Sequence, residues 1–280
     1  MIKLSMQTLS FKESVPSGEY DLFELIQIAA DLGYDGVDLE DRQFESTDPE
    51  YLERLRLHTL LLGMPINYFG VGGGFGQGWR GDDDGHIAHI KHWISVARAM
   101  QVPMLRLVGC QPEPGESDEE AWPRLAAYFR EVTAFAREQK VVIGLHNHNH
   151  GMFPATSDQI MQMLDEINDP YFVHILDTGQ YRGGRGASKY DEDPNRDDYD
   201  LYDNIAGSID RAVLVRAKIY AIGSGSEEWI DYPRVMSILK ASGFKGWLSV
   251  VFEGRDGTPD MQAMKLAHGY LRGLLREYAI

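Results

Sequence analysis

The chain has 280 residues, of which 43% are hydrophobic, so it is long enough to bury a sizeable core. Its 43 acidic residues outnumber its 27 lysines and arginines, and the formal net charge is −16. This charge argues against nucleic acid and anionic membranes as partners, because both need a concentrated lysine and arginine surface.

The cysteine content and the N-terminal segment further limit the kind of protein that this chain can be. Cys110 is the only cysteine, which excludes a disulfide or a cysteine-based metal cluster within one chain. No neighbouring cation in the sequence activates it, so we expect a small buried thiol. The first residues lack the charged and apolar regions of a signal peptide. No apolar run approaches the roughly 20 residues that span a bilayer. We therefore expect a cytoplasmic protein.

Short apolar segments alternate with longer amphipathic segments along the chain. The expected strands, in chain order, are residues 2–6, 36–40, 65–69, 104–108, 141–146, 172–176, 213–219 and 247–252. The expected helices are residues 20–32, 50–62, 86–100, 119–139, 157–167, 232–242 and 260–278. Their apolar residues recur three and four apart, which is typical of a helix with one buried face. Eight strands alternating with helices predict a (β/α)8 TIM barrel, a single domain over residues 1–280.

The connections that follow the expected strands are irregular and polar. Residues 71–84 are rich in glycine and aspartate, residues 111–119 are acidic with two prolines, and residues 182–200 form a long polar stretch. In a barrel such connections lie at the carboxyl ends of the strands, where active sites are found. The stretch 182–200 is either a lid or interface, or a disordered excursion.

Charged and polar side chains gather at the ends of several expected strands. Residues two apart in a strand share a face, so Asp38 and Glu40 form a pair, as do Arg216 and Lys218. Charged side chains in apolar strands are costly to bury unless they are paired or face a wet pocket. The whole set comprises Asp38, Glu40, Asn67, Arg106, His146, His148, Asp177, Arg216, Lys218 and Glu253. We expect these residues to face one shared pocket for a small, polyhydroxylated, sugar-like substrate.

Structural roles for some of these residues stay open. Arg106 is either a substrate contact or an ion-pair partner of Asp38 or Glu40. Lys218 either acts on substrate or only neutralises Asp177. Asp177 itself either belongs to the pocket or caps the next helix.

The segment HNHNH at residues 146–150 places three histidines at alternating positions. A lone histidine is more often structural, whereas three in this spacing favour metal binding or proton transfer. His146 and His148 are therefore the candidates for acid/base chemistry.

Five strand-end motifs together resemble those of one superfamily. They are GVDLE at 36–40, GLHNH at 144–148, LDTGQ at 176–180, RAKIY at 216–220 and LSVVFEG at 248–254. In order and spacing the chain resembles, over nearly its whole length, the xylose-isomerase-like barrels. This superfamily includes sugar isomerases, sugar-phosphate epimerases and inosose dehydratases. Its DNA-repair endonucleases need a zinc cluster and a basic groove, and neither is visible here.

The resemblance also implies a divalent cation, often Mn²⁺, held by glutamate, aspartate, histidine and glutamate on strands five to eight. The cation bridges substrate oxygens while the two glutamates transfer protons. Carried over by position, these ligands fall on His146, Asp177, Arg216 and Val251, so only Asp177 matches. Arginine cannot ligate a cation and valine has no ligand atom. We therefore do not expect a metal at the usual position; Mn²⁺, Zn²⁺ or Mg²⁺ on His146, Asp177 and Glu253 is the alternative.

The resemblance implies an isomerase or epimerase of a sugar, keto-sugar or cyclitol that works by proton transfer next to a carbonyl. His146 or His148 would be the general acid/base, with Asp177 and Glu253 as partners. Cationic side chains would stabilise developing oxyanion charge. The expected substrate contacts are Glu40, Asn67, Arg106, Arg216 and Lys218.

Two other functions stay open. One is a carbon–glycoside deglycosidase or dehydratase-type lyase of the same superfamily, which would release an aglycone or water. The other is a non-catalytic sugar-binding barrel that has lost its metal. Related barrels often assemble, so the resemblance also implies a homo-oligomer.

Overall fold

The computed structural model describes residues 2–11, 19–186 and 198–280. Most of the stretch 182–200, which was expected to be a lid, an interface or a disordered excursion, lies outside these ranges. None of the helices in the described part of the chain is both long and apolar enough to cross a bilayer.

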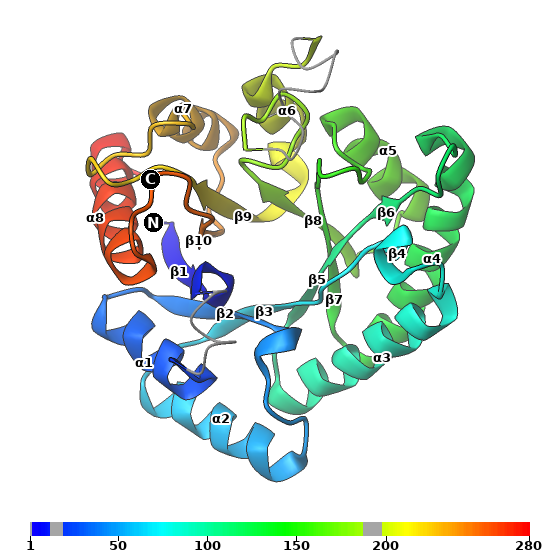
Figure 1. Cartoon of the computed structure of the whole chain (residues 1–280), viewed down its shortest axis with the longest axis horizontal. Coiled ribbons are helices and arrows are strands. Elements are labelled where there is room, and N and C mark those ends of the chain that lie inside the picture. The colour runs from blue at the N-terminus through cyan, green and yellow to red at the C-terminus, as the bar shows by residue number, and fades with distance from the viewer. Residues whose placement is uncertain (1, 12–18, 187–197) are drawn as a thin grey trace. The chain divides into compact units, whose positions relative to one another are not determined.

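Eight parallel strands form a closed barrel, as predicted (Figure 1). They are β1 (Lys3–Gln7), β2 (Gly36–Glu40), β3 (Ile66–Gly70), β5 (Met104–Val108), β7 (Val142–His146), β8 (Phe172–Asp177), β9 (Ala212–Ile219) and β10 (Trp247–Phe252). Their order around the barrel is β1-β10-β9-β8-β7-β5-β3-β2. Each strand begins and ends within one residue of its expected bounds. The apolar runs of the sequence therefore locate the strands correctly.

The seven expected helices are present and one further helix was missed. The expected ones are α1 (Leu22–Asp31), α2 (Pro49–Leu61), α3 (Asp83–Met100), α4 (Asp118–Gln139), α5 (Ser157–Ile167), α7 (Tyr232–Ser242) and α8 (Asp260–Tyr278). The missed helix is α6 (Leu201–Ser208), whose sequence LYDNIAGS contains weak helix formers. Two short strands, β4 (Phe75–Gly76) and β6 (Cys110–Gln111), pair outside the barrel and were also not predicted.

Capping residues in the sequence fix where two of the long helices begin. The Asp21 side chain accepts a hydrogen bond from the Glu24 backbone N–H, and the Glu24 side chain accepts one from Asp21 N–H. Ser117 and Glu120 form the same reciprocal arrangement before α4. Such capping boxes satisfy backbone donors that have no partner inside the helix.

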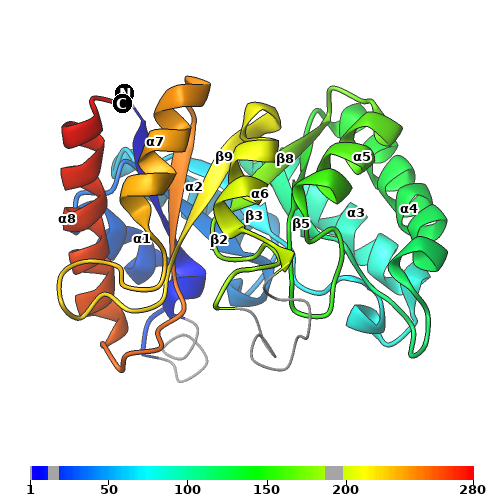
Figure 2. The same cartoon turned by 90° about the horizontal axis from the view of Figure 1, so that it is seen from above.

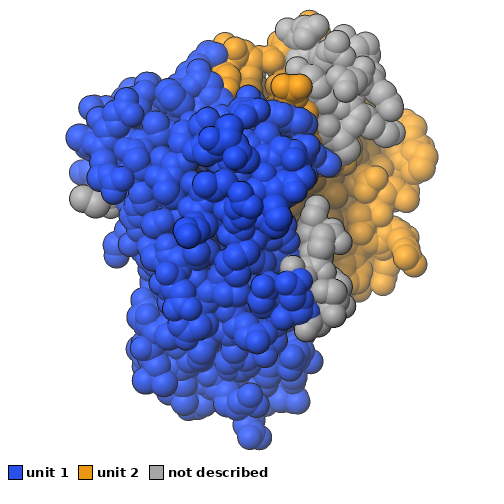
Figure 3. All heavy atoms as spheres, turned by 60° about the vertical axis from the view of Figure 1, so that its left-hand side comes forward, with its two compact units in different colours: residues 1–67, 214–280 blue, residues 68–213 orange. Residues whose placement is uncertain are grey.

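The chain divides into two compact units, coloured separately in Figure 3. Unit 1 consists of Met1–Asn67 and Leu214–Ile280, and unit 2 consists of Tyr68–Val213. A single domain over residues 1–280 stays a prediction. In unit 1, α8 packs against β1 and β10. In unit 2, α4 packs against β7 and lies beside α3 (Figure 2).

Cys110 lies in unit 2 with no exposed surface, as expected for a structural thiol. Burial raises its pKa to about 11. The thiolate form is therefore scarce near neutral pH, and Cys110 is a poor nucleophile.

Candidate functional site

In unit 2, the ends of two neighbouring strands bring His146 and Asp177 together. Strands β7 and β8 are parallel, with His146 opposite Ile175, so Asp177 lies just beyond the end of β7. The His146 Nε2 atom is 3.2 Å from the Asp177 Oδ2 atom, and both side chains are buried. A histidine next to a buried carboxylate is an arrangement used for proton transfer.

Neighbouring residues contact the backbone N–H, the backbone carbonyl and both carboxylate oxygens of Asp177. The Asn147 side-chain oxygen accepts from Asp177 N–H at 2.8 Å, and the Asn147 amide donates to the Asp177 carbonyl at 3.0 Å. The Gly179 N–H donates to Asp177 Oδ1 at 2.9 Å, while Oδ2 faces His146. Asp177 is therefore the last residue of β8, and its side chain supports the turn that begins at Thr178. It does not cap the next described helix, which begins only at Leu201.

The other two histidines of the HNHNH segment, His148 and His150, follow His146 along the same loop. The ring centroids of His146 and His148 are 5.5 Å apart, and those of His148 and His150 are 4.9 Å apart. The His148 N–H donates to the Pro154 carbonyl at 3.0 Å, which fixes the course of this loop. The three histidine rings therefore lie next to one another along this loop.

Unit 2 also contains a buried hydrogen-bonded network of neutral side chains. The His174 Nδ1 atom is 3.0 Å from the Leu145 carbonyl oxygen, and its Nε2 atom is 3.0 Å from the Tyr181 hydroxyl. The Tyr181 hydroxyl lies 2.6 Å from Ser208 Oγ. A carbonyl only accepts, so Nδ1 carries the proton and Nε2 accepts from Tyr181. Burial lowers the pKa of His174 to about 4 and raises that of Tyr181, so both stay neutral at pH 7.

In unit 1, Asp38 is the centre of a buried polar group. The Ser5 hydroxyl donates to Asp38 Oδ2 at 2.5 Å. Burial raises the pKa of Asp38 to about 6, although hydrogen bonds from Ser5, Ser249 and Asn67 and the charge of Arg216 oppose this rise. Desolvation disfavours the charged carboxylate more strongly than these partners favour it.

Two buried cations occupy successive inward positions of β9. Arg216 and Lys218 are both nearly inaccessible to solvent. The Lys218 Nζ atom donates to Glu253 Oε1 at 2.7 Å, an ion pair that the sequence did not predict. In the same unit, the Gln7 side-chain amide donates to Glu40 Oε1 at 2.7 Å.

The expected site residues divide between the two units. Unit 1 contains Glu40, Asn67, Arg216, Lys218 and Glu253, and unit 2 contains Arg106, His146, His148 and Asp177. The structure joins His146 to Asp177 and Lys218 to Glu253. Arg106 is buried on β5, and its role stays a prediction.

Several buried polar residues of these groups escaped the sequence analysis. They are Ser5, Gln7, Ser249, Asn147 and His174. Ser5 and Gln7 had a usable signal, because polar residues at alternate positions of an apolar strand share one face. Asn147 had no such signal, because it lies in the loop segment HNHNH rather than in an apolar strand.

The residues present do not fit the divalent cation of the family resemblance. Across the described ranges there is no group of three or more histidine, cysteine, aspartate or glutamate side chains that could hold a metal ion. His146 and Asp177 bond to each other, and Glu253 is ion-paired with Lys218. The two remaining family positions are Arg216 and Val251, which offer no ligand atom at neutral pH.

Comparison with solved structures shows the same fold. An L-ribulose 3-epimerase is 15% identical, with 100% of this chain and 96% of that chain covered and a TM-score of 0.74. The zinc-bound IOLI protein is 16% identical, with 99% of both chains covered and a TM-score of 0.74. The 3-keto-D-glucoside 4-epimerase of E. coli is 15% identical, with coverages of 100% and 99% and a TM-score of 0.66.

The comparison with protein families is more specific. No curated protein matches the sequence. The family model described as xylose isomerase-like TIM barrel matches residues 26–274, which confirms the resemblance seen in the strand-end motifs. Because this match covers most of its length, the chain belongs to the xylose isomerase-like TIM barrel family.

Proposed function

We propose that this protein is a sugar isomerase or epimerase that transfers a proton at a carbon next to a carbonyl. The observation that carries the proposal is the buried hydrogen bond between His146 and Asp177. Asn147 and Gly179 hold Asp177 in place, so the carboxylate is oriented before any substrate arrives. The structural similarity to two sugar epimerases supports this reaction class.

The proposed chemistry follows from the two tautomeric nitrogens of His146. When Nε2–H donates to Asp177 Oδ2, the Nδ1 lone pair can take the proton from the substrate carbon. The electron pair of the broken C–H bond then moves to the carbonyl oxygen and gives an enediolate. Asp177 stabilises the imidazolium, which returns the proton to the neighbouring carbon in an isomerisation. Epimerisation at the same carbon needs a second acid that delivers a proton from the opposite face of the enediolate. His148 is the second candidate for the base.

The buried cations of unit 1 are assigned to charge stabilisation and substrate binding. Arg216 keeps its proton at any working pH, so it offers a fixed positive charge for an enediolate oxygen. Lys218 offers a second charge, which Glu253 balances in the absence of substrate. Further substrate contacts are assigned to Glu40, Asn67 and Arg106. No step of this proposal passes through a metal ion.

A non-catalytic sugar-binding barrel is the second candidate. It is favoured by the replacement of two usual metal ligands by Arg216 and Val251. The oriented His146–Asp177 pair favours catalysis instead, because binding alone does not require a fixed proton-transfer geometry.

The proposed function is tested by incubating the purified protein with a panel of ketopentoses, ketohexoses and keto-cyclitols and analysing the products by NMR. We expect a rearranged sugar; released aglycone or water would identify the lyase instead. His146→Ala and Asp177→Asn should each lower turnover by about 10² or more. The control His92→Ala, an exposed residue of α3, should retain full turnover.

Binding of a sugar without conversion would favour the non-catalytic barrel. A wild-type rate in the His146→Ala variant would remove His146 from the reaction. We also expect dialysis against a chelator to leave the melting temperature and turnover unchanged. A loss that Mn²⁺ or Zn²⁺ restores would show that a metal is needed after all.

A further inference from the structure

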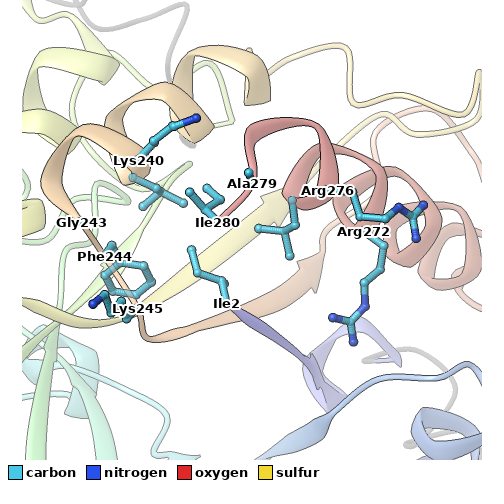
Figure 4. A pocket seen from close by; sticks show the side chains of 11 residues that line it. Ile2, Lys240, Gly243, Phe244, Lys245, Arg272, Arg276, Ala279 and Ile280 are labelled. Carbon is cyan, nitrogen blue, oxygen red and sulfur yellow. The ribbon is translucent and has the colours of Figure 1, made fainter.

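Unit 1 has an apolar hollow of about 570 Å³ at the ends of α7 and α8, which we call the basal pocket (Figure 4). Ile2, Leu239, Phe244 and Leu275 form much of its apolar lining. The volume falls within the range of about 300–1,000 Å³ that is typical of small-molecule sites, which are mostly apolar with a few polar groups. The basal pocket therefore has the size and the lining of a site for a small ligand with an apolar body.

The basal pocket is separate from the substrate contacts that are proposed in unit 1. Helix α7 ends a few residues before β10 begins, and Ile2 immediately precedes β1, so the pocket lies where these strands start. Glu40, Lys218 and Glu253 lie at or next to the opposite ends of their strands. A ligand in the basal pocket would therefore not occupy the place assigned to the sugar.

The basal pocket is also lined by four cationic side chains, namely Lys240, Lys245, Arg272 and Arg276. In Figure 4 the two lysines lie on one side of Ile2 and the two arginines lie on the other. Among the described residues that line the pocket, none is acidic. The alkyl stems of lysine and arginine extend an apolar surface while their charged ends stay in water. This arrangement matches a ligand with an apolar body and an anionic end.

Two of these cations have partners within the protein and two do not. The partnered contacts are the Arg272–Asp35 ion pair at 2.5 Å and the hydrogen bond from Lys240 Nζ to the Tyr278 carbonyl oxygen at 2.8 Å. Lys245 and Arg276 are exposed and form no ion pair with any residue that the structure describes. This is notable in a chain whose 43 acidic side chains outnumber its 27 lysines and arginines. Both cations are therefore available to bind an anion from solution.

We propose that the basal pocket binds a medium-chain fatty acid. The alkyl chain lies against the apolar lining, and the carboxylate pairs with the cations Lys245 and Arg276. A free sugar would make little use of the apolar lining, and a neutral hydrocarbon would make none of the cations. A protein partner fits less well, because it needs a broad complementary surface of about 800 Å² on each side rather than a single hollow.

Isothermal titration calorimetry of the full chain with dodecanoate, kept below its micelle concentration, tests this proposal. We expect one site per chain, and binding of dodecyltrimethylammonium, which has the opposite charge, should be weaker by about tenfold or more. The variant Lys245→Gln/Arg276→Gln should weaken dodecanoate binding by about fivefold or more. The matched control Arg98→Gln/Lys140→Gln removes two exposed cations of unit 2 and should bind dodecanoate like the wild type.

Two single variants locate the bound dodecanoate. Ile280→Glu places a carboxylate in the lining of the basal pocket and should weaken binding by about tenfold or more. His146→Ala, in the proposed catalytic site, should bind dodecanoate like the wild type. The melting temperature of each variant without ligand shows whether a loss of binding reflects a loss of fold.

Three results of the titrations would overturn the proposal. They are the absence of saturable dodecanoate binding, equal binding of dodecanoate and its cationic analogue, and wild-type affinity in Lys245→Gln/Arg276→Gln. Association with phosphatidylglycerol vesicles without binding of free dodecanoate would also overturn it, because the cations would then serve a membrane surface. None of these results bears on the proposed sugar chemistry, which uses other residues.

Discussion

The two units bury polar side chains in different ways. In unit 2, neutral or proton-sharing groups are tied by hydrogen bonds: His146 to Asp177, and His174 to Tyr181. In unit 1, full charges are buried, with Lys218 ion-paired to Glu253 at 2.7 Å. Unit 2 therefore has the features needed to move a proton, whereas unit 1 has those needed to offer fixed charge.

This difference predicts opposite responses to pH. His174 of unit 2 is kept neutral by burial, so acid favours the unfolded chain, where the imidazole can bind a proton. Asp38 of unit 1 has a raised pKa, so acid favours the folded chain, where the carboxyl holds its proton more tightly. Replacing one residue at a time separates the two contributions.

The largest effect is expected for Arg216→Met. Removing this buried cation takes away one of the groups that favour the charged form of Asp38, which should lower the free energy of unfolding by about 3–5 kcal/mol at pH 8. The loss should shrink below pH 6, where Asp38 becomes neutral. Urea unfolding at both pH values measures this. The control Arg130→Met removes an exposed pair with Glu166 and should cost about 0–1 kcal/mol. Equal costs would show that unit 1 does not depend on its buried charge.

The second effect concerns His174, whose pKa is lowered from 6.5 to about 4. Its stabilising contribution is present above pH 6.5 and is lost as the pH falls toward 4. The full loss is about 3 kcal/mol, since one pKa unit corresponds to about 1.4 kcal/mol. His174→Gln should flatten this part of the curve of unfolding free energy against pH. An unchanged slope would mean that His174 can be protonated in the folded protein.

Asp38→Asn tests the opposite sign in unit 1. The pKa of Asp38 rises from 3.8 to about 6, so the wild-type contribution decreases as the pH rises through this window. The variant should lack that decrease, which amounts to about 3 kcal/mol at most. The measurement is the difference in unfolding free energy between wild type and variant at several pH values. A difference that does not vary with pH would contradict the assignment.

The smallest effect is expected for Asn147→Leu, which removes both hydrogen bonds to the Asp177 backbone. Two buried backbone groups lose their partner, at a cost of about 2 kcal/mol. Asn149→Leu, which removes a single bond to the Tyr181 carbonyl, should cost about half as much. If Asn149→Leu proves the more damaging, Asn147 is not what fixes the Asp177 loop.

The fold was largely predictable because strand and helix periodicity are local properties of the sequence. Helix α6 escaped because its eight residues include Asp203, Asn204 and Gly207, which lower helix propensity. Its capping by Asp200, whose side chain accepts from two backbone N–H groups, was the available signal.

Site residues could be predicted from the sequence only where a charged side chain lies in an apolar strand, because burying a charge costs free energy. Arg216, Lys218 and Asp177 were identified in this way, since a charge in an apolar strand must be paired or face a wet pocket. Which groups pair depends on register and side-chain geometry, so the Lys218–Glu253 ion pair was not foreseen. Uncharged residues such as Asn147 gave no comparable signal.

Deuterium incorporation tests most directly whether the pair formed by His146 and Asp177 transfers a proton. Each ketose of the panel is incubated with the protein in D₂O, and exchange of the hydrogen next to the carbonyl is followed by NMR. We expect exchange with the wild type for at least one sugar and a rate lower by about 10² or more with His146→Ala. Exchange at the same rate in both proteins, or in neither, would contradict it.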